Sequence, residues 1–198
     1  MSVMSYLGFR SAAIGVGVAG LLAGAVATAP DGLAVPARPG EAAAATTTLT
    51  FTRNSGDPTN SRLSVVRDGR TVAVFRAGSG LGASHPQGRD ECARSKGWLP
   101  AGTYSVGART TRYNGRVIKG YAIPLSDKTC KDGRTPRTEL FIHSEMTRDG
   151  GQGQAEGQRW DGVKDYKSAG CVKLSPQDIK KLFGVLGQGS APKRLTVR

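Results

Sequence analysis

The chain has 198 residues, of which 38% are hydrophobic and 22% charged, and its formal net charge is +13. This length and mixed composition exclude a chain of mainly low-complexity sequence and fit one globular domain with extra segments. The positive charge predicts attraction to polyanions, although charge alone does not separate nucleic acid, acidic lipid and anionic cell-wall polymer.

The N-terminus has the pattern of a secretory signal peptide, expected over residues 1–29. Arg10 supplies a short positive region, an uncharged run follows, and Ala27-Thr28-Ala29 forms a small-residue cleavage site. An uncleaved signal anchor is the alternative, because the run is nearly long enough to span a bilayer. Its Ala and Gly content favours cleavage. We therefore expect a location outside the cytoplasmic membrane, secreted or in the cell envelope.

Residues 30–45 are rich in Pro, Gly and Ala and have few bulky side chains, so they are predicted to be a linker. The mature domain is then expected over 46–198. Export also changes the expected state of the cysteines, since disulfides persist outside the cytosol. Cys92 and Cys130 lie in polar, turn-rich stretches and are predicted to pair, which leaves Cys171 free. Two free surface thiols are the alternative.

Short β-branched segments dominate the rest of the chain. They are expected as strands at 48–53, 61–68, 71–77, 102–109, 117–123, 138–143, 171–174 and 194–198. Asp68-Gly69 predicts a tight hairpin between the second and third, and Asn114-Gly115 predicts a second hairpin that pairs 102–109 with 117–123. This spacing favours a mainly β fold, a single sandwich or barrel with one or two short helices.

One helix is expected to begin after Ser175. Ser175 is a good N-cap, Pro176 suits the first helical position, and Asp178 follows three residues after the cap. Apolar residues then recur at helical spacing, at Ile179, Leu182, Phe183 and Leu186. This face is predicted to pack on the sheet.

His143 and Cys171 are the two residues that suggest chemistry. A thiol becomes a useful nucleophile when a base takes its proton, and histidine is suited to that role near neutral pH. Gly170 permits a sharp turn beside the sulfur, and the amides of Gly170 and Cys171 could stabilise an oxyanion. His85 is the competing histidine, but its Gly/Pro-rich surroundings predict a loop without a special role.

The motif formed by FIH at 141–143 and SAGCVKL at 168–174 resembles the signature of the L,D-transpeptidase (YkuD-like) family. The segments 61–80 and 99–106 are similar to the family's opening hairpin and to its P-x-G-x-Y strand. The resemblance covers roughly residues 50–185 and implies that family's catalytic fold. It also implies an exported acyltransferase of peptidoglycan biogenesis.

The resemblance implies Cys171 as nucleophile and His143 as general base and then acid. Ser168 would form hydrogen bonds within the site, and Lys173 stands where the family usually has arginine. Ala169 replaces a second histidine of the family motif, so the group that orients His143 is expected to be a backbone carbonyl. The long segment 144–167 is predicted to act as a lid.

Trp160 and Tyr166 would contact the substrate from this lid, or, as the alternative, only pin the segment to the body of the domain.

Peptidoglycan stem peptides are the expected substrate, and the cationic surface would bind anionic cell-wall polymer. A carboxypeptidase using the same site, or a non-catalytic wall-binding domain, are the alternatives. Nucleic acid is not an expected partner, because no basic surface studded with aromatic residues is evident. No cofactor and no metal site are predicted, since the histidines and cysteines lack ligand spacing. The domain is expected to be a monomer.

Overall fold

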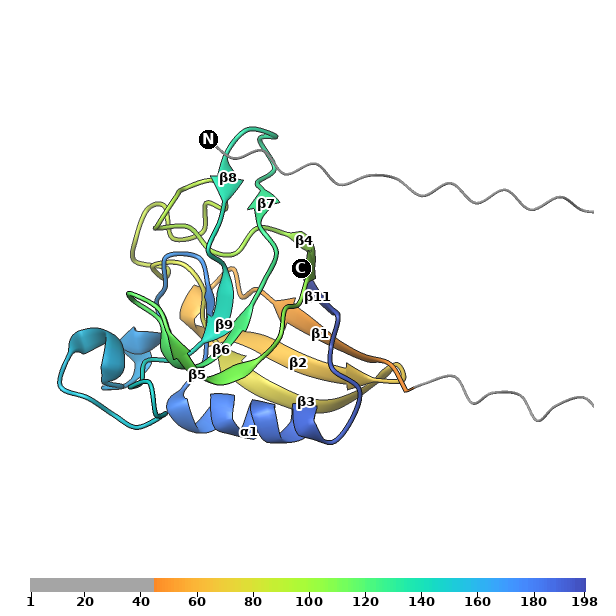
Figure 1. The fold of residues 1–198 in the computed structure, drawn as a ribbon. Helices are drawn as coiled ribbons and strands as arrows, with labels where there is room; N and C mark the ends of the chain where they lie inside the picture. The colour runs from red at the N-terminus through yellow and green to blue at the C-terminus, as the bar shows by residue number, and fades with distance from the viewer. Residues whose placement is uncertain (1–44) are drawn as a thin grey trace, which may run out of the picture. The chain divides into compact units, whose positions relative to one another are not determined.

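The computed structural model describes residues 45–198. The signal peptide predicted over 1–29 and nearly all of the linker predicted over 30–45 lie outside this range. Within it, no helix is long and apolar enough to cross a membrane. The described chain is mainly β, as the strand pattern predicts, with two larger sheets and one α-helix beside them (Figure 1).

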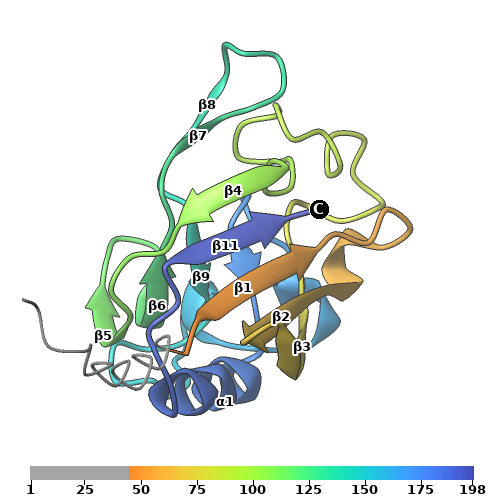
Figure 2. The same cartoon turned by 90° about the vertical axis from the view of Figure 1, so that its right-hand side faces the viewer.

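The first sheet has five strands in the order β3-β2-β1-β11-β4. Their bounds are β1 Thr47–Thr52, β2 Ser61–Arg67, β3 Arg70–Ala77, β4 Gly102–Ser105 and β11 Arg194–Val197. Neighbouring strands are antiparallel except β1 and β11, which pair in parallel with Leu49 opposite Leu195. The C-terminal strand is therefore an inner strand of the sheet, between β1 and the edge strand β4 (Figure 2).

The second sheet has four strands in the order β10-β9-β6-β5, and a separate two-stranded ribbon pairs β7 with β8. The bounds are β5 Thr110–Asn114, β6 Lys119–Pro124, β7 Lys128–Thr129, β8 Pro136–Arg137, β9 Phe141–His143 and β10 Val172–Lys173. Three 3-10 turns, η1 Pro58–Asn60, η2 Glu156–Gln158 and η3 Val163–Tyr166, lie in the connections.

Two local predictions hold at the residue level. Asp68 and Gly69 both have positive φ, 49° and 76°, as a tight two-residue hairpin between β2 and β3 requires. The helix α1, Pro176–Gly187, begins after Ser175, whose hydroxyl accepts a hydrogen bond of 3.1 Å from the Asp178 amide. All four apolar residues predicted for its inner face are buried, at Ile179, Leu182, Phe183 and Leu186.

The pairing predicted for 102–109 is wrong. Residues 102–105 form β4 and pair with β11, whereas β6 pairs with β5, a strand that the sequence pattern did not indicate. β5 is polar and contains no fully buried residue, because it is the edge strand of its sheet. An edge strand with one exposed rim lacks the apolar alternation on which strand prediction depends.

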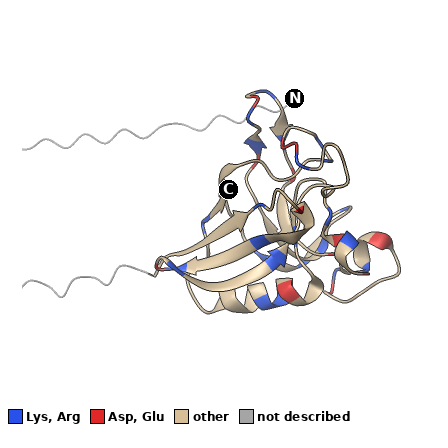
Figure 3. Cartoon of the chain, turned by 180° about the vertical axis from the view of Figure 1, so that it is seen from behind, with Lys and Arg blue, Asp and Glu red and all other residues tan. Residues whose placement is uncertain are grey.

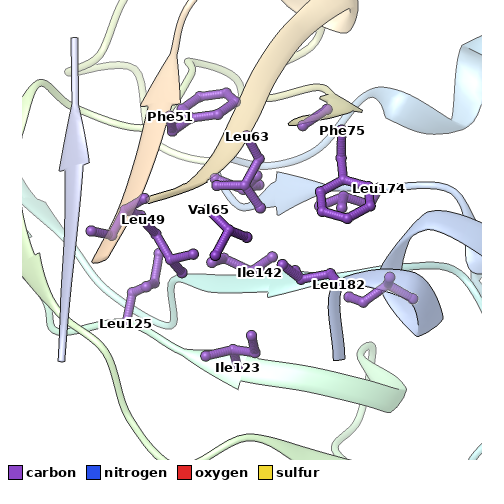
Figure 4. Close-up of a cluster of buried hydrophobic side chains, with 14 of the residues drawn as sticks. Leu49, Phe51, Leu63, Val65, Phe75, Ile123, Leu125, Ile142, Leu174 and Leu182 are labelled. Atoms are coloured by element: carbon purple, nitrogen blue, oxygen red, sulfur yellow. The ribbon is translucent and has the colours of Figure 1, made fainter. Parts of the chain in front are cut away.

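The core lies between the two larger sheets and α1. Side chains from the first sheet, among them Leu63 and Val65, meet Ile123 and Ile142 from the second sheet and Leu182 from the helix (Figure 4). Each of these five is at most 1% exposed. Burial of one such side chain contributes about 1.5–3 kcal/mol, so this cluster fixes the place of β9, the strand that carries His143.

Candidate active site

Two adjacent parallel strands bring the predicted pair of residues together. β10 lies beside β9 with Val172 opposite Ile142 and Lys173 opposite His143, so Cys171 directly precedes the paired segment. His143 and Cys171 line the same pocket, which has a volume of about 300 Å³. The pocket wall opposite them comes from the β5–β6 hairpin, with Tyr113, Gly115, Arg116, Val117 and Ile118. The sequence predicts a hairpin turn at Asn114-Gly115, but neither β5 nor the place of this hairpin in the pocket wall.

Cys171 is a free cysteine and only 8% exposed. Burial raises the pKa of its thiol to about 11, although the Phe141 amide and the positive charge of Lys173 act in the opposite direction. The sulfur lies 3.6 Å from the Glu139 carbonyl oxygen, to which the thiol donates. At neutral pH the side chain is therefore a protonated thiol that needs a base before it can act as a nucleophile.

His143 is neutral at the same pH. Burial and, to a smaller extent, the charge of Lys173 lower the pKa of its imidazole to about 4. Its Nδ1 lies 3.0 Å from the Ser144 carbonyl oxygen. A carbonyl can only accept, so Nδ1 carries the proton and Nε2 keeps a lone pair for a proton from another group. The structure thus orients the ring through a backbone carbonyl, the kind of group that the sequence led us to expect.

The loop from Ser168 to Cys171 is held in place by hydrogen bonds to the carbonyl oxygens of its last three residues. Arg137 donates to the Ala169 carbonyl at 3.2 Å, the Ser79 hydroxyl to that of Gly170 at 3.2 Å, and the Ser168 hydroxyl to that of Cys171 at 2.7 Å. Gly170 has a φ of 127°, a conformation that side-chain-bearing residues rarely adopt. The loop is therefore fixed before any substrate binds.

One of the two expected oxyanion donors is already occupied. The Gly170 amide donates to the Ser168 hydroxyl oxygen at 3.1 Å. The Cys171 amide, by contrast, has no hydrogen-bond partner within residues 45–198. In a trans peptide the N–H points opposite to the preceding C=O, so this amide points away from Ser79, which holds the Gly170 carbonyl. The Cys171 amide remains as the free donor beside the sulfur.

Lys173, the basic residue of the motif, is buried beside His143. Its ammonium binds the Glu145 carboxylate and donates to the Lys167 carbonyl at 2.8 Å. Glu145 is itself nearly covered, and its second carboxylate oxygen, Oε2, is buried without a partner. Burial raises the pKa of Glu145, against the effect of Lys173. Lys173 therefore adds a fixed positive charge to the pocket that it lines.

The remaining predicted site residues have different places. Ser168 and Ala169 both line the pocket, and Ala169 brings no imidazole to it. Trp160 and Tyr166 are not among the lining residues. They stack edge to face with ring centroids 4.9 Å apart, and Arg76 lies over the Tyr166 ring at 4.5 Å. Tyr166 thus contacts the body of the domain through Arg76, and Trp160 contacts Tyr166 within the same segment.

Cys92 and Cys130 form a disulfide, with their Cα atoms 5.4 Å apart. Together with Asp132 they are the only clustered potential metal ligands among residues 45–198, and the disulfide removes both sulfurs from that role. His85 lies away from the pocket, and its Nδ1 accepts a hydrogen bond of 3.1 Å from the Gln87 amide.

Comparison with known proteins gives the family of the chain and agrees with its fold. The family model for the L,D-transpeptidase catalytic domain (YkuD) matches residues 56–196, and the chain belongs to this family. No curated protein gives a significant sequence match.

Solved structures with a similar fold include Bd1075 of Bdellovibrio bacteriovorus, at 14% identity and a TM-score of 0.50, with 79% of this chain and 49% of that chain covered. Pgp2, the helical cell shape determining protein of Campylobacter jejuni, has 16% identity and a TM-score of 0.47, with 78% and 50% covered. L,D-transpeptidase 1 of Mycobacterium tuberculosis has 14% identity and a TM-score of 0.41, with 77% and 62% covered. The chain thus spans about half to three fifths of the length of these three structures.

Proposed function

We propose that this chain is an L,D-transpeptidase, a cysteine acyltransferase that cross-links peptidoglycan stem peptides through a thioester on Cys171. The observation that carries the proposal is a free thiol and a neutral imidazole that line one pocket, the imidazole on β9 and the thiol directly before the neighbouring strand β10. Membership of the L,D-transpeptidase family supports the same chemistry.

In the first half-reaction, Nε2 of His143 takes the thiol proton while the sulfur attacks an amide carbonyl on the L side of an L,D peptide bond. Both groups are neutral at rest, with pKa values of about 11 and about 4, so proton transfer and attack are coupled. The Cys171 amide stabilises the oxyanion. The C–N bond then breaks, and D-alanine leaves with the proton from His143.

In the second half-reaction, an amine of a neighbouring stem attacks the thioester carbon. His143 takes a proton from this amine and returns it to the sulfur as the C–S bond breaks, which restores the thiol and leaves an amide cross-link. Water in place of the amine would make the same site an L,D-carboxypeptidase.

Charges around the pocket suit an anionic peptide. Arg116 lines the pocket from the tip of the β5–β6 hairpin, is exposed, and forms no ion pair with another residue of the described range. A stem peptide carries carboxylates, which a free guanidinium can bind in a bidentate manner. Elsewhere, Lys and Arg are spread over strands, loops and α1 (Figure 3), which suits long-range attraction to anionic wall polymer.

The proposed place of action is outside the cytoplasmic membrane. The disulfide between Cys92 and Cys130 supports it, because such bonds persist in oxidising compartments. The signal peptide predicted from the sequence agrees with it.

Intact mass after incubation with muropeptides or a carbapenem tests the proposal, with wild type, Cys171→Ala and His143→Gln compared. We expect a covalent adduct on the wild type, none on Cys171→Ala, and much slower formation on His143→Gln. An adduct on both the wild type and Cys171→Ala, or on neither, contradicts the proposal. Analysis of muropeptide products then separates cross-links from trimmed stems, and binding to wall polymer without any adduct indicates a non-catalytic domain.

A further inference from the structure

Arg137 is a buried cation without a carboxylate partner. The residue is 3% exposed, and within residues 45–198 its guanidinium forms no ion pair. It donates instead to four backbone carbonyls: those of Glu91, Gly97 and Trp98, from one loop, and that of Ala169. A buried charge without an opposite charge costs free energy even when it is hydrogen-bonded, which indicates a role for Arg137 other than stabilising the fold.

The guanidinium lies directly against the loop that carries the nucleophile. A Cβ at Gly170 would stand 2.1 Å from Nη2 of Arg137, so only a glycine lets the two groups come this close. Arg137 also lines a second pocket of about 250 Å³ together with Glu139, Ala169 and Cys171. Arg137 thus contacts the two residues before Cys171 and shares a pocket with its side chain.

The other three carbonyls belong to a rigidly held segment. Glu91 forms an ion pair with Arg53 at 2.9 Å and accepts from the amides of Ala101 and Lys131. The next residue, Cys92, is joined to Cys130 by the disulfide. Arg137 therefore connects the nucleophile loop to a part of the domain that is anchored at several points.

The position of Arg137 also affects the charge beside the sulfur. The charged groups that act on Cys171 are Arg137 from β8, Lys173 from β10 and Glu139 from the segment before β9; His143, from β9, is neutral. The two cations favour the thiolate and Glu139 opposes it. Lys173 is ion-paired with Glu145, whereas Arg137 has no ion pair among the described residues and is held by backbone carbonyls.

We propose that Arg137 is a positioning residue for the nucleophile: it holds the Ala169–Gly170 backbone so that the Cys171 amide stays free, and it places a buried positive charge beside the sulfur. The effect of Arg137 on acylation rests on the proposed transpeptidase function, whereas its effect on the reactivity of the Cys171 thiol does not.

The test compares wild type, Arg137→Met, Arg137→Lys and Arg67→Met. Arg67 is a matched control, since it is a half-buried arginine that donates to the Val185 carbonyl at 3.0 Å, beside the end of α1. Two rates are measured: alkylation by iodoacetamide as a function of pH, and acylation by a carbapenem. Cys171 is the one free thiol in the chain, so alkylation reports on a single site.

Arg137→Met should slow alkylation at a fixed pH of about 8 to 9 by about tenfold, because loss of a nearby cation raises the thiol pKa. Acylation should fall about a hundredfold, as expected for a displaced reacting group. Arg137→Lys should keep alkylation within about threefold, yet lose about tenfold in acylation, because an ammonium cannot reach all four carbonyls. Arg67→Met should match the wild type in both rates.

A folded Arg137→Met variant in which either rate stays at the wild-type value overturns the proposal, as does an equal loss in Arg67→Met. Circular dichroism establishes folding. If Arg137→Met does not fold, Arg137→Lys decides: wild-type acylation overturns the proposal, and loss of acylation with retained alkylation supports it. If the wild type is not acylated at all, the transpeptidase function fails, and the alkylation rates alone decide the role of Arg137.

Discussion

Lys173 lies opposite His143 in the parallel pair of β10 and β9, and its charge helps to lower the pKa of the imidazole to about 4. The same lysine lowers the pKa of the Cys171 thiol, although burial outweighs it. This charge therefore adds to the effect of burial, which keeps the base unprotonated, and eases the loss of the thiol proton. The pH dependence of the site follows from this relationship.

Acylation should be nearly independent of pH across the neutral range. The reactive pair needs a neutral imidazole, present above pH about 4, and a protonated thiol, present below pH about 11. The acid limb of the rate profile should thus lie near pH 4, well below that of an ordinary histidine. Stopped-flow or mass-spectrometric rates of carbapenem acylation measure it. An acid inflection near pH 6.5, the ordinary histidine value, would contradict this assignment.

The same pKa makes folding stability depend on pH. The folded chain resists protonation of His143 down to pH about 4, whereas the unfolded chain takes up the proton near pH 6.5. Stability from the neutral ring is therefore present above pH 6.5 and is lost as the pH falls toward 4. Urea unfolding of the wild type and of His143→Gln between pH 4 and 6.5 should show that the free energy of unfolding depends less steeply on pH in the variant. Equal slopes would assign the acid sensitivity to other groups.

Removal of the Lys173 charge should affect both stability and the acid limb. Lys173→Met leaves Glu145 buried and unpaired, which should cost about 3–5 kcal/mol in free energy of unfolding. The His143 pKa should rise, so the acid limb of acylation moves to higher pH. The double variant Lys173→Met with Glu145→Gln should regain part of the stability but keep the shifted limb. Denaturant unfolding and rate profiles of both variants measure the two effects separately.

Ser168 is central to the loop, because its hydroxyl accepts from the amides of Gly80 and Gly170 and donates to the Cys171 carbonyl. Ser168→Ala should lower stability by about 1–3 kcal/mol and reduce acylation by about tenfold or more as the loop loosens. Ser126→Ala is the control, since Ser126 is an exposed serine that accepts one backbone amide far from the pocket. Equal acylation rates in the two variants would show that the Ser168 bonds do not matter for the loop.

The disulfide should stabilise both the domain and its nucleophile loop. Cys92 and Cys130 are separated by 38 positions, for which the chain-entropy model gives about 4 kcal/mol. The double variant Cys92→Ser with Cys130→Ser should therefore melt at a lower temperature. Its acylation rate should fall too, because the segment that holds Arg137 loses an anchor. Calorimetry measures the melting temperature, and acylation with and without a reductant measures the rate. A wild-type acylation rate in a folded double variant would show that the disulfide does not influence the site.

Local signals were the predictable part of this structure. The Asp68-Gly69 hairpin and the Ser175 cap depend on residues next to one another, and both form as expected. The pair His143 and Cys171 could be proposed because the two residue types carry chemistry and stand in a known motif. Each of these needs only a short stretch of sequence.

Contacts between distant segments were not predictable. Arg137 stands in a polar, turn-rich stretch, and only the folded loop around Glu91, Gly97 and Trp98 buries it. The pocket wall at the β5–β6 hairpin was missed for a related reason, since β5 is a polar edge strand. Tyr166 gave an ambiguous signal, because an aromatic residue in a long loop can face either a ligand or, as here, the body of its own domain.

The parallel pairing of β9 with β10 has a consequence for the evolution of this site. The pairs Val172–Ile142 and Lys173–His143 fix the register of the two strands, and a bridge between Gly78, just after β3, and Lys173 is a further tether. The two ends of the intervening stretch, 144–167, are therefore held at a fixed distance from each other, whatever the length of the stretch. Residues can be inserted or deleted at its outer end without moving the sulfur relative to the imidazole, which makes this stretch the natural place for members of the family to diverge and for a designer to graft new sequence.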